Sequence, residues 1–227
     1  SNSDSITYDT TPTVKVVLNT SAGASKSHVA GDTVQVLVSG TVVQTQFVTG
    51  ADISNGYIDL TLPAQTGGTL AITANVVDIL GNTSDTSATA LSVSLDTSAP
   101  LLSITDSVAS EITGGSDVTF RFTFDEAVAG FTASKIDVSG GVKGVFSGSG
   151  TNYALVVTPT ANQANGSIVV SVSSSNATGI TNAAGLSLNA TNYSHSQTYD
   201  TLGPVVSSVS VPSSATYGAT DQLSFGV

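Results

Sequence analysis

The sequence predicts an all-β protein built from tandem sandwich domains, and three observations lead to this prediction. Short segments rich in Val, Thr, Ile and Leu alternate with clusters of Gly, Asn, Asp, Ser and Pro, which is typical of strands and their turns. No segment of useful length has the 3.6-residue apolar period of a helix. A short acidic phrase also recurs at intervals close to the size of one small β domain.

The recurring phrase marks the expected joints between modules. It reads Tyr8-Asp9-Thr10-Thr11-Pro12, then Leu95-Asp96-Thr97-Ser98-Ala99-Pro100, then Tyr199-Asp200-Thr201-Leu202-Gly203-Pro204. The match extends upstream, because residues 5–10 and 196–201 agree at five of six positions. We therefore expect four segments: a last-strand remnant of a preceding module (1–8), two complete modules (9–95 and 96–199) and the incomplete start of a third (200–227).

Each complete module contains six or seven predicted strands. In the first module they are Val14–Leu18, Thr33–Val38, Thr41–Phe47, Tyr57–Leu62, Leu70–Val77 and Ala88–Leu95. In the second they are Leu101–Thr105, Val118–Phe124, Lys135–Val138, Val142–Phe146, Tyr153–Thr158, Ser167–Ser173 and Tyr193–Tyr199. Alternation along Val118–Phe124 places the valine and the three phenylalanines on one buried face. This strand length and spacing favours an immunoglobulin-like Greek-key sandwich over a barrel.

Composition excludes several classes of function. The chain has no Cys, so disulfide, thiol and zinc-thiolate chemistry are excluded. Five basic residues against 16 acidic ones make nucleic acid an improbable partner. The longest apolar runs are too short to insert into a membrane, and the printed sequence has no signal-peptide pattern. We expect a secreted or bacterial cell-surface protein whose partners are the neighbouring modules of the same chain, with no small-molecule substrate.

The acidic residues suggest a hard cation as a ligand. Fourteen of the 16 acids are Asp, although turns also favour Asp through local hydrogen bonds to the backbone. In an immunoglobulin-like sandwich, two inter-strand loops gather at the end where the chain enters. Asp9 is therefore expected beside the loop 78–85, and Asp96 beside Asp125-Glu126 and the loop 181–185. Oxygen ligands from such loops suit Ca²⁺ better than Mg²⁺, which requires a tighter octahedron.

These residues resemble a known family. The phrase at each joint, the loop Asp78-Ile-Leu-Gly81-Asn82 and the run Phe122-Thr-Phe-Asp-Glu-Ala-Val128 are similar to tandem bacterial immunoglobulin-like repeats of giant secreted adhesins, including biofilm-associated and RTX-type adhesins. The resemblance implies spacer modules, many with calcium at their joints. It makes the candidate metal ligands Asp9, Asp78, Asn82, Asp96, Asp125, Glu126 and Asn182. Asn182-Ala-Ala-Gly185-Leu186 departs from the family's common Asp-x-x-Gly-Asn, and Asp125 stands where Ser is frequent.

Other functions are less well supported by the sequence. No Gly-x-Ser-x-Gly motif occurs, and neither His28 nor His195 has a nearby acid that the sequence marks as a triad partner, so we do not expect an enzyme. The main alternative is a glycan- or host-surface-binding module that uses exposed tyrosines as a platform. We expect the tyrosines to lie at strand ends or core rims instead, with Tyr8 and Tyr199 packing against the next module. Lys15 is expected to point outward from an edge strand, and among the three repeated aspartates we expect an ion least at Asp200.

Overall fold

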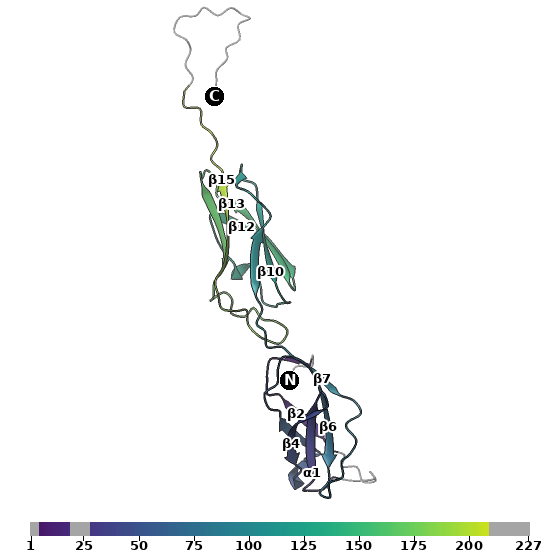
Figure 1. The fold of residues 1–227 in the computed structure, drawn as a ribbon. Helices are drawn as coiled ribbons and strands as arrows, with labels where there is room; N and C mark the ends of the chain where they lie inside the picture. The colour runs from purple at the N-terminus through teal and green to yellow at the C-terminus, as the bar shows by residue number, and fades with distance from the viewer. Residues whose placement is uncertain (1–4, 19–27, 209–227) are drawn as a thin grey trace, which may run out of the picture.

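The computed structural model describes residues 5–18 and 28–208 and shows two β modules arranged end to end (Figure 1). The first module contains β1 (Ile6–Thr7), β2 (Thr13–Val17), β3 (Thr33–Val38), β4 (Thr41–Phe47), α1 (Gly50–Asn55), β5 (Tyr57–Thr61), β6 (Gly68–Val77) and β7 (Leu91–Leu95). The second contains β8 (Leu102–Asp106), β9 (Ile112–Thr113), β10 (Val118–Phe124), the 3-10 helix η1 (Ala133–Lys135), β11 (Asp137–Ser139), β12 (Gly141–Ser149), β13 (Asn152–Pro159), β14 (Gly166–Val172) and β15 (Tyr193–Asp200). Within the described ranges, neither helix is long and apolar enough to cross a membrane.

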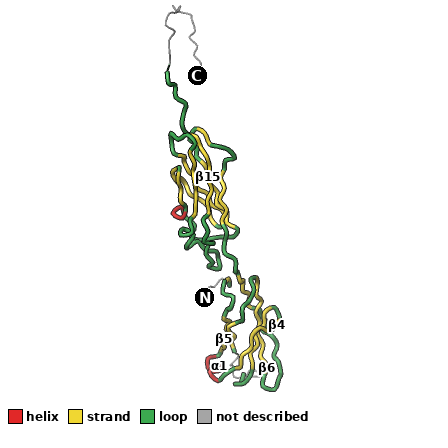
Figure 2. The backbone as a smooth tube through the Cα atoms, turned by 60° about the vertical axis from the view of Figure 1, so that its left-hand side comes forward, coloured by secondary structure: helices red, strands yellow, loops and turns green. Residues whose placement is uncertain are grey.

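Each module is a sandwich of two sheets, as the sequence predicts. The first module has a five-stranded sheet, β1-β7-β6-β3-β4, and a two-stranded sheet, β2-β5. The second has two four-stranded sheets, β12-β13-β10-β8 and β11-β14-β15-β9. Strands that are consecutive in sequence often lie in different sheets, which is the Greek-key pattern of immunoglobulin-like domains. Figure 2 shows strands through both modules, with helix confined to short segments.

Two strands of the first module, β1 and β2, have equivalents in the second module, β9 and β10. The repeated phrase does not predict this correspondence. β1 and β9 both pair in parallel with the last strand of their module, β7 and β15. β2 and β10 also correspond. In the first module β2 pairs antiparallel with β5, which follows α1, and in the second β10 pairs antiparallel with β13, which follows β12. β10 also pairs with β8. Among described residues the first module has no counterpart of β8, so β2 follows the acidic phrase directly.

The position of β1 bears on the expected module boundaries. Residues 1–8 were expected to be the remnant of a preceding module, but residues 1–4 lie outside the described chain. Ile6 pairs with Ser94 and Thr7 with Leu95, so these residues extend the sheet of the first module. The boundaries at 9, 96 and 200 stay a prediction, and β1 is described here with the sheet that it joins. The expected third-module segment is described only as far as residue 208 and has no strand over 201–208.

The core of the second module is aromatic and follows the predicted alternation. Val118, Phe120 and Phe122 are fully buried and Phe124 nearly so. The ring of Phe131 contacts those of Phe124 and Tyr153, with centroids 5.1 and 5.0 Å away. The first module has a separate aliphatic core around Val34, Val36, Ile58, Leu60 and Leu62. Each module therefore has a core of its own, which is the property that defines a domain.

Helix α1 is too short to produce a recognisable apolar period in the sequence. It has six residues, less than two turns, and none of them is buried. It begins with a capping box, because the Asp52 amide donates to the Thr49 hydroxyl and the Asp52 carboxylate accepts from the Thr49 amide. The Thr49 hydroxyl also donates to the Asp52 carboxylate at 2.6 Å, and this bond, together with the one from the Thr49 amide, holds the pKa of Asp52 below its ordinary value. Local capping, not an apolar stripe, determines this helix.

Candidate cation site at the joint between the modules

The buried amide of Asn182 lies among three oxygen atoms at the start of the second module. Its Nδ2 donates to Asp96 Oδ2 at 2.8 Å, to Glu126 Oε2 at 3.0 Å and to the Ser98 carbonyl at 3.2 Å. Asn182 is only 5% exposed. Two segments far apart in sequence, the linker with Asp96 and Ser98 and the end of β10 with Glu126, therefore direct oxygen atoms at the amide of a third.

Strand ends bring these segments together. Asp96 follows β7, Glu126 follows β10, and Asn182 belongs to the long connection after β14. Phe124 pairs with Leu102, so β10 ends where β8 begins, next to the linker from Asp96. The amide nitrogen of Leu101 donates to Asp125 Oδ1 at 2.8 Å, and this bond fixes the linker against the end of β10. The predicted meeting of Asp96 with the loops at 125–126 and 181–185 is confirmed.

The loop around Asn182 is held by its own hydrogen bonds. Asn182 Oδ1 accepts from the Leu186 amide at 2.9 Å, and the Asn182 amide donates to the Leu186 carbonyl at 3.0 Å. Gly185 closes the turn with a bond to the Asn182 carbonyl. Because Oδ1 is occupied in this way, the NH₂ group is the part of the side chain that faces the acids.

The electrostatics of this cluster favour additional positive charge. An amide NH₂ has two hydrogens, so it cannot fully satisfy three acceptors of which two are carboxylates. Burial raises the pKa of Glu126, and the negative charges of Asp96 and Asp125 raise it further, while the hydrogen bond from Asn182 lowers it. A bound cation would oppose both causes of the increase in pKa.

Asp125 lies apart from this point because its carboxylate binds the linker amide of Leu101. The cluster therefore contains two carboxylates, one carbonyl and one amide. Over residues 5–18 and 28–208, no group of three or more His, Cys, Asp or Glu side chains is placed to hold a metal. Sequence reasoning overlooked the Ser98 carbonyl, which no residue pattern can indicate because every residue carries one.

The other expected cluster is not assembled, and the expectation that Asp9 lies beside the loop 78–85 is wrong. Thr7 and Gly68 both pair with Leu95, so Asp9 lies near the Gly68 end of β6. Asp78 directly follows Val77 at the other end of this ten-residue strand, about 30 Å away. The reason is topological: without a counterpart of β8, the chain after Asp9 enters β2 from the opposite end of the sandwich.

Asp78 and Asn82 do lie together, although their arrangement is that of a turn. Asn82 Nδ2 donates to Asp78 Oδ2 at 2.9 Å, and the Asn82 amide donates to Oδ1 at 2.8 Å. Gly81 donates to the Asp78 carbonyl, just as Gly185 donates to the Asn182 carbonyl. The loops 78–82 and 182–186 therefore have the same backbone hydrogen bonds, and Asp78 is the counterpart of Asn182.

The repeated aspartates share a simple local role. Asp9, Asp96 and Asp200 each accept, through Oδ1, the backbone amide two residues later, at 2.9, 3.0 and 2.9 Å. This is the Asx turn that makes Asp frequent in loops. Local turn chemistry therefore accounts for the phrase in all three places. Asp96 also accepts, through Oδ2, a hydrogen bond from Asn182, which is 86 residues away in sequence.

Tyr8 and Tyr199, which occupy matching positions in the phrase, behave differently. A Cβ atom on Gly185 would lie 3.5 Å from the Tyr8 ring, so Tyr8 packs against the second module as expected. Tyr199 is 2% exposed and belongs to the core of its own module.

Tyr57 lies under Lys15, whose Nζ is 3.6 Å from the ring centroid. Lys15 itself is exposed, as predicted. These positions do not favour a tyrosine platform for glycans.

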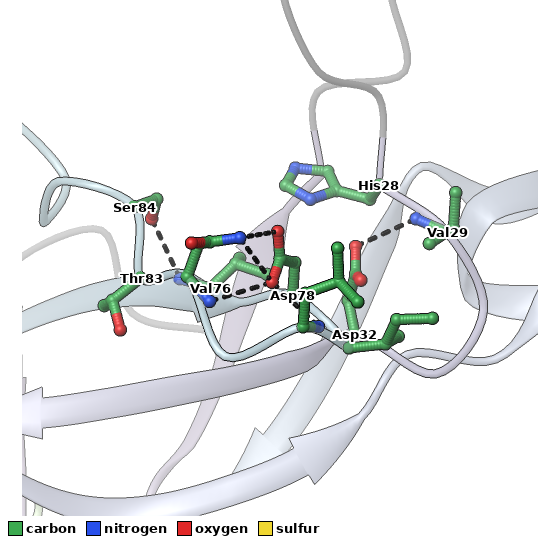
Figure 3. Close-up of a pocket in the computed structure, with 10 residues that line it drawn as sticks. His28, Val29, Asp32, Val76, Asp78, Thr83 and Ser84 are labelled. Atoms are coloured by element: carbon green, nitrogen blue, oxygen red, sulfur yellow. Dashed lines mark hydrogen bonds between the residues drawn. The ribbon is translucent and has the colours of Figure 1, made fainter.

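A separate pocket lies at the far end of the first module, beside the loop 78–82 (Figure 3). Its volume is about 470 Å³, and its lining combines apolar side chains, including Ile79 and Leu80, with His28, Asp32 and Asp78. Asp32 Oδ2 accepts from the Val29 amide at 2.9 Å. Asp32 Oδ1 is buried without a hydrogen-bond partner in the described chain. No sequence pattern pointed to this pocket.

Comparisons with known proteins agree with the fold of the second module. No curated protein matches the chain. Among solved structures, the fibronectin(III)-like modules of Clostridium thermocellum CbhA align over 87% of both chains at 10% identity, but the TM-score of 0.30 is too low to support an argument. Residues 96–201 match the family model described as bacterial Ig-like domain. The second module is therefore a bacterial Ig-like domain, a structural module typical of extracellular and cell-surface proteins.

Proposed function

We propose that this chain is a spacer segment of a bacterial surface adhesin, with calcium stiffening the joint at Asp96. A bacterial Ig-like domain, a second sandwich placed end to end with it and a joint of six residues (96–101) support a spacer role. The absence of basic patches and thiols in the sequence agrees with a structural module. The adhesive site of such a protein would lie in another part of it.

The convergence of three oxygens on one point carries the calcium part of the proposal. Asp96 Oδ2, Glu126 Oε2 and the Ser98 carbonyl lie 2.8 to 3.2 Å from Asn182 Nδ2. Ca²⁺ binds oxygens at about 2.3–2.6 Å and accepts 6 to 8 of them, with water completing the shell. A small contraction of the loops and displacement of the NH₂ group would therefore suit this ion. The donor set fits calcium in kind, with three protein oxygens and water as the remaining ligands.

Binding would add a connection between the linker and the end of β10, which the hydrogen bond from the Leu101 amide to Asp125 already joins. The ion would neutralise Asp96 and Glu126 and connect the linker to the end of β10, beside the loop that carries Asn182. Tyr8 of the first module contacts Gly185 in the Asn182 loop, so the cluster lies next to the surface against which the first module packs. Lower mobility of the linker is the expected consequence, with a narrower range of angles between the modules.

The experiment compares calcium binding and chain length in two matched variants. Asp96→Asn removes one charge from the cluster, whereas Asp200→Asn removes the same charge from the same Asx turn at the other end of the module. Calorimetric titration should give calcium binding for the wild type and for Asp200→Asn, and loss of it for Asp96→Asn. Small-angle scattering should show a longer, less variable chain in calcium than in EDTA.

The spacer and calcium parts can fail separately. Equal calcium binding by the wild type and Asp96→Asn would contradict the assignment of the ion to this cluster. Unchanged scattering and melting temperature in calcium and EDTA would contradict a stiffening role. Saturable binding of the chain to a glycan array would instead favour a ligand-binding module.

A further inference from the structure

Strands β4 and β5 of the first module are edge strands of different sheets and lie beside each other. β4 ends the five-stranded sheet, and β5 pairs with β2 on one side only. In the second module β13, the counterpart of β5, has β12 paired along its other side. Between β4 and β5 the first module has helix α1 in place of such a strand (Figure 2). Two strand edges therefore meet at a position that a strand occupies in the second module.

The backbone groups on these two edges can be identified from the bonds on the opposite side of each strand. The Val48 amide donates to the Asp32 carbonyl, so Val48 faces β3 and Thr45 faces away from it. The Leu62 amide donates to the Pro12 carbonyl, so Thr61 faces away from β2. Backbone groups directed outward from an edge strand are a template for a strand of another molecule.

The side chain of Gln44 binds one such group on each edge. Its Oε1 accepts from the Thr45 amide at 3.3 Å, and its Nε2 donates to the Thr61 carbonyl at 3.0 Å. A side-chain amide carries the same carbonyl acceptor and N–H donor as a peptide unit. Gln44 therefore offers an acceptor to β4 and a donor to β5, as the backbone of an inserted strand would.

A bulge in β4 explains why Gln44 reaches the other sheet. Gln44 pairs with Val36 and Val42 pairs with Leu37, so Val43 is an additional residue on β4. Val43 packs against the core of the first module. In a regular strand the next side chain would point to solvent. A bulge bends the strand and redirects its side chains, and here it turns Gln44 toward β5.

Helix α1 covers the part of these edges that Gln44 does not reach. It connects the end of β4 to the start of β5, contacts β5, and packs Ile53 against the core of the module. A helix placed over a sheet edge is one of the ways in which proteins prevent further strand pairing. Gln44 and α1 together occupy the side of the sandwich where β12 lies in the second module.

We propose that Gln44 protects the edges of β4 and β5 from strand addition by other copies of this chain. β4 reads Thr-Val-Val-Gln-Thr-Gln-Phe and contains no charged residue, Pro or Gly, which are the residues that otherwise discourage pairing at an edge. Its last residue, Phe47, is 70% exposed. Similar modules at high local concentration are prone to pair wrongly, so an array of them needs this protection.

The test compares two glutamines of the same strand. Gln44→Ala removes both contacts, whereas Gln46→Ala removes the same side chain from an exposed position two residues later. In hydrogen exchange, the Thr45 amide should exchange several times faster in Gln44→Ala than in Gln46→Ala. In sedimentation velocity of the full chain, Gln44→Ala should associate roughly tenfold more strongly, as expected for one or two added backbone hydrogen bonds between chains.

A second change shows whether the exposed backbone causes the association. Thr45→Pro, added to Gln44→Ala, removes the N–H that Gln44 covers and leaves the bonds to β3 intact, because Thr45 faces away from β3. Association of this double variant should return to the level of Gln46→Ala. Circular dichroism and the melting temperature verify that each variant is folded.

Three outcomes would overturn the proposal. They are equal exchange of the Thr45 amide in the two single variants, equal association of these variants, and association of the double variant as strong as that of Gln44→Ala. Because each result is measured relative to Gln46→Ala, association through any other surface cancels. All samples contain EDTA, so the result is separate from calcium binding at Asp96.

Discussion

His195 Nε2 and Asp106 Oδ2 lie 2.7 Å apart and connect the two sheets of the second module. Asp106 ends β8 in one sheet, and His195 lies on β15 in the other. The His195 ring also meets Phe120 of the core, with centroids 6.2 Å apart. The residues are separated by 89 positions, which is why no sequence pattern identified the pair.

Removing this imidazole should destabilise the second module. The Asp106 side chain is 6% exposed, so His195→Ala leaves a buried carboxylate oxygen without its partner. We expect a loss of about 1–3 kcal/mol in the free energy of unfolding. Urea denaturation followed by tyrosine fluorescence measures it. Ser196→Ala, on the exposed face of the same strand, is the control, and an equal loss in both variants would contradict a specific role for the pair.

Gly166→Ala should destabilise the same module through a steric clash. A Cβ at Gly166 would lie 2.3 to 2.8 Å from three atoms of the Tyr199 ring, which is buried and cannot move aside. Overpacking of this kind costs about 1–3 kcal/mol, which lowers Tm by at least about 4 °C in a domain of this size. Gly203→Ala meets no atom within 4 Å and should leave the calorimetric Tm unchanged.

The raised pKa of Glu126 predicts a pH dependence of stability. Its pKa in the folded state lies above the ordinary value of 4.5 because burial disfavours the charged form. The folded state therefore binds more protons than the unfolded state, and the contribution of Glu126 to stability decreases as pH rises through its folded pKa. Below 4.5 the penalty disappears. In EDTA, Glu126→Gln should flatten this part of the profile in urea denaturation, and an unchanged profile would contradict the effect.

Asn182→Asp should make the joint depend on calcium. The change converts the NH₂ donor among the acids into a third carboxylate and reproduces the acid found at Asp78. In EDTA, repulsion among Asp96, Glu126 and the new acid should lower Tm. In calcium, the extra charge should tighten binding and raise Tm above that of the wild type. Calorimetry in the two buffers tests the reversal. A variant less stable than the wild type in both buffers would argue against a cation at this point.

The fold was predictable from the sequence because its strands are short, β-branched and separated by clear turns. The predicted segments 33–38, 41–47 and 118–124 match β3, β4 and β10 without change. The site was predictable only in part. Asp96, Glu126 and Asn182 meet as expected, because the second module has the complete set of strands that the loop argument assumed.

The prediction for Asp9 failed for a physical reason that local patterns do not contain. A repeated phrase reports the local chemistry of an Asx turn, which Asp9, Asp96 and Asp200 all share. It does not report which strand follows the turn. After Asp96 the chain forms β8, and after Asp9 it forms β2, which occupies the place of the next strand along. The position of Asp9 therefore depends on which strands pair over long sequence separations.

The parallel pair of β1 and β7 determines how the first module would respond to pulling. The Ser94 amide donates to the Ser5 carbonyl, and the Asp96 amide donates to the Thr7 carbonyl. Tension applied through the two ends of the module draws these parallel strands in opposite directions along their length. Both hydrogen bonds are then loaded at once, in shear, and cannot open one after the other as in a peeled hairpin. In single-molecule stretching, Ser94→Pro removes the amide that donates to Ser5, so it should lower the rupture force of the first module and leave that of the second unchanged.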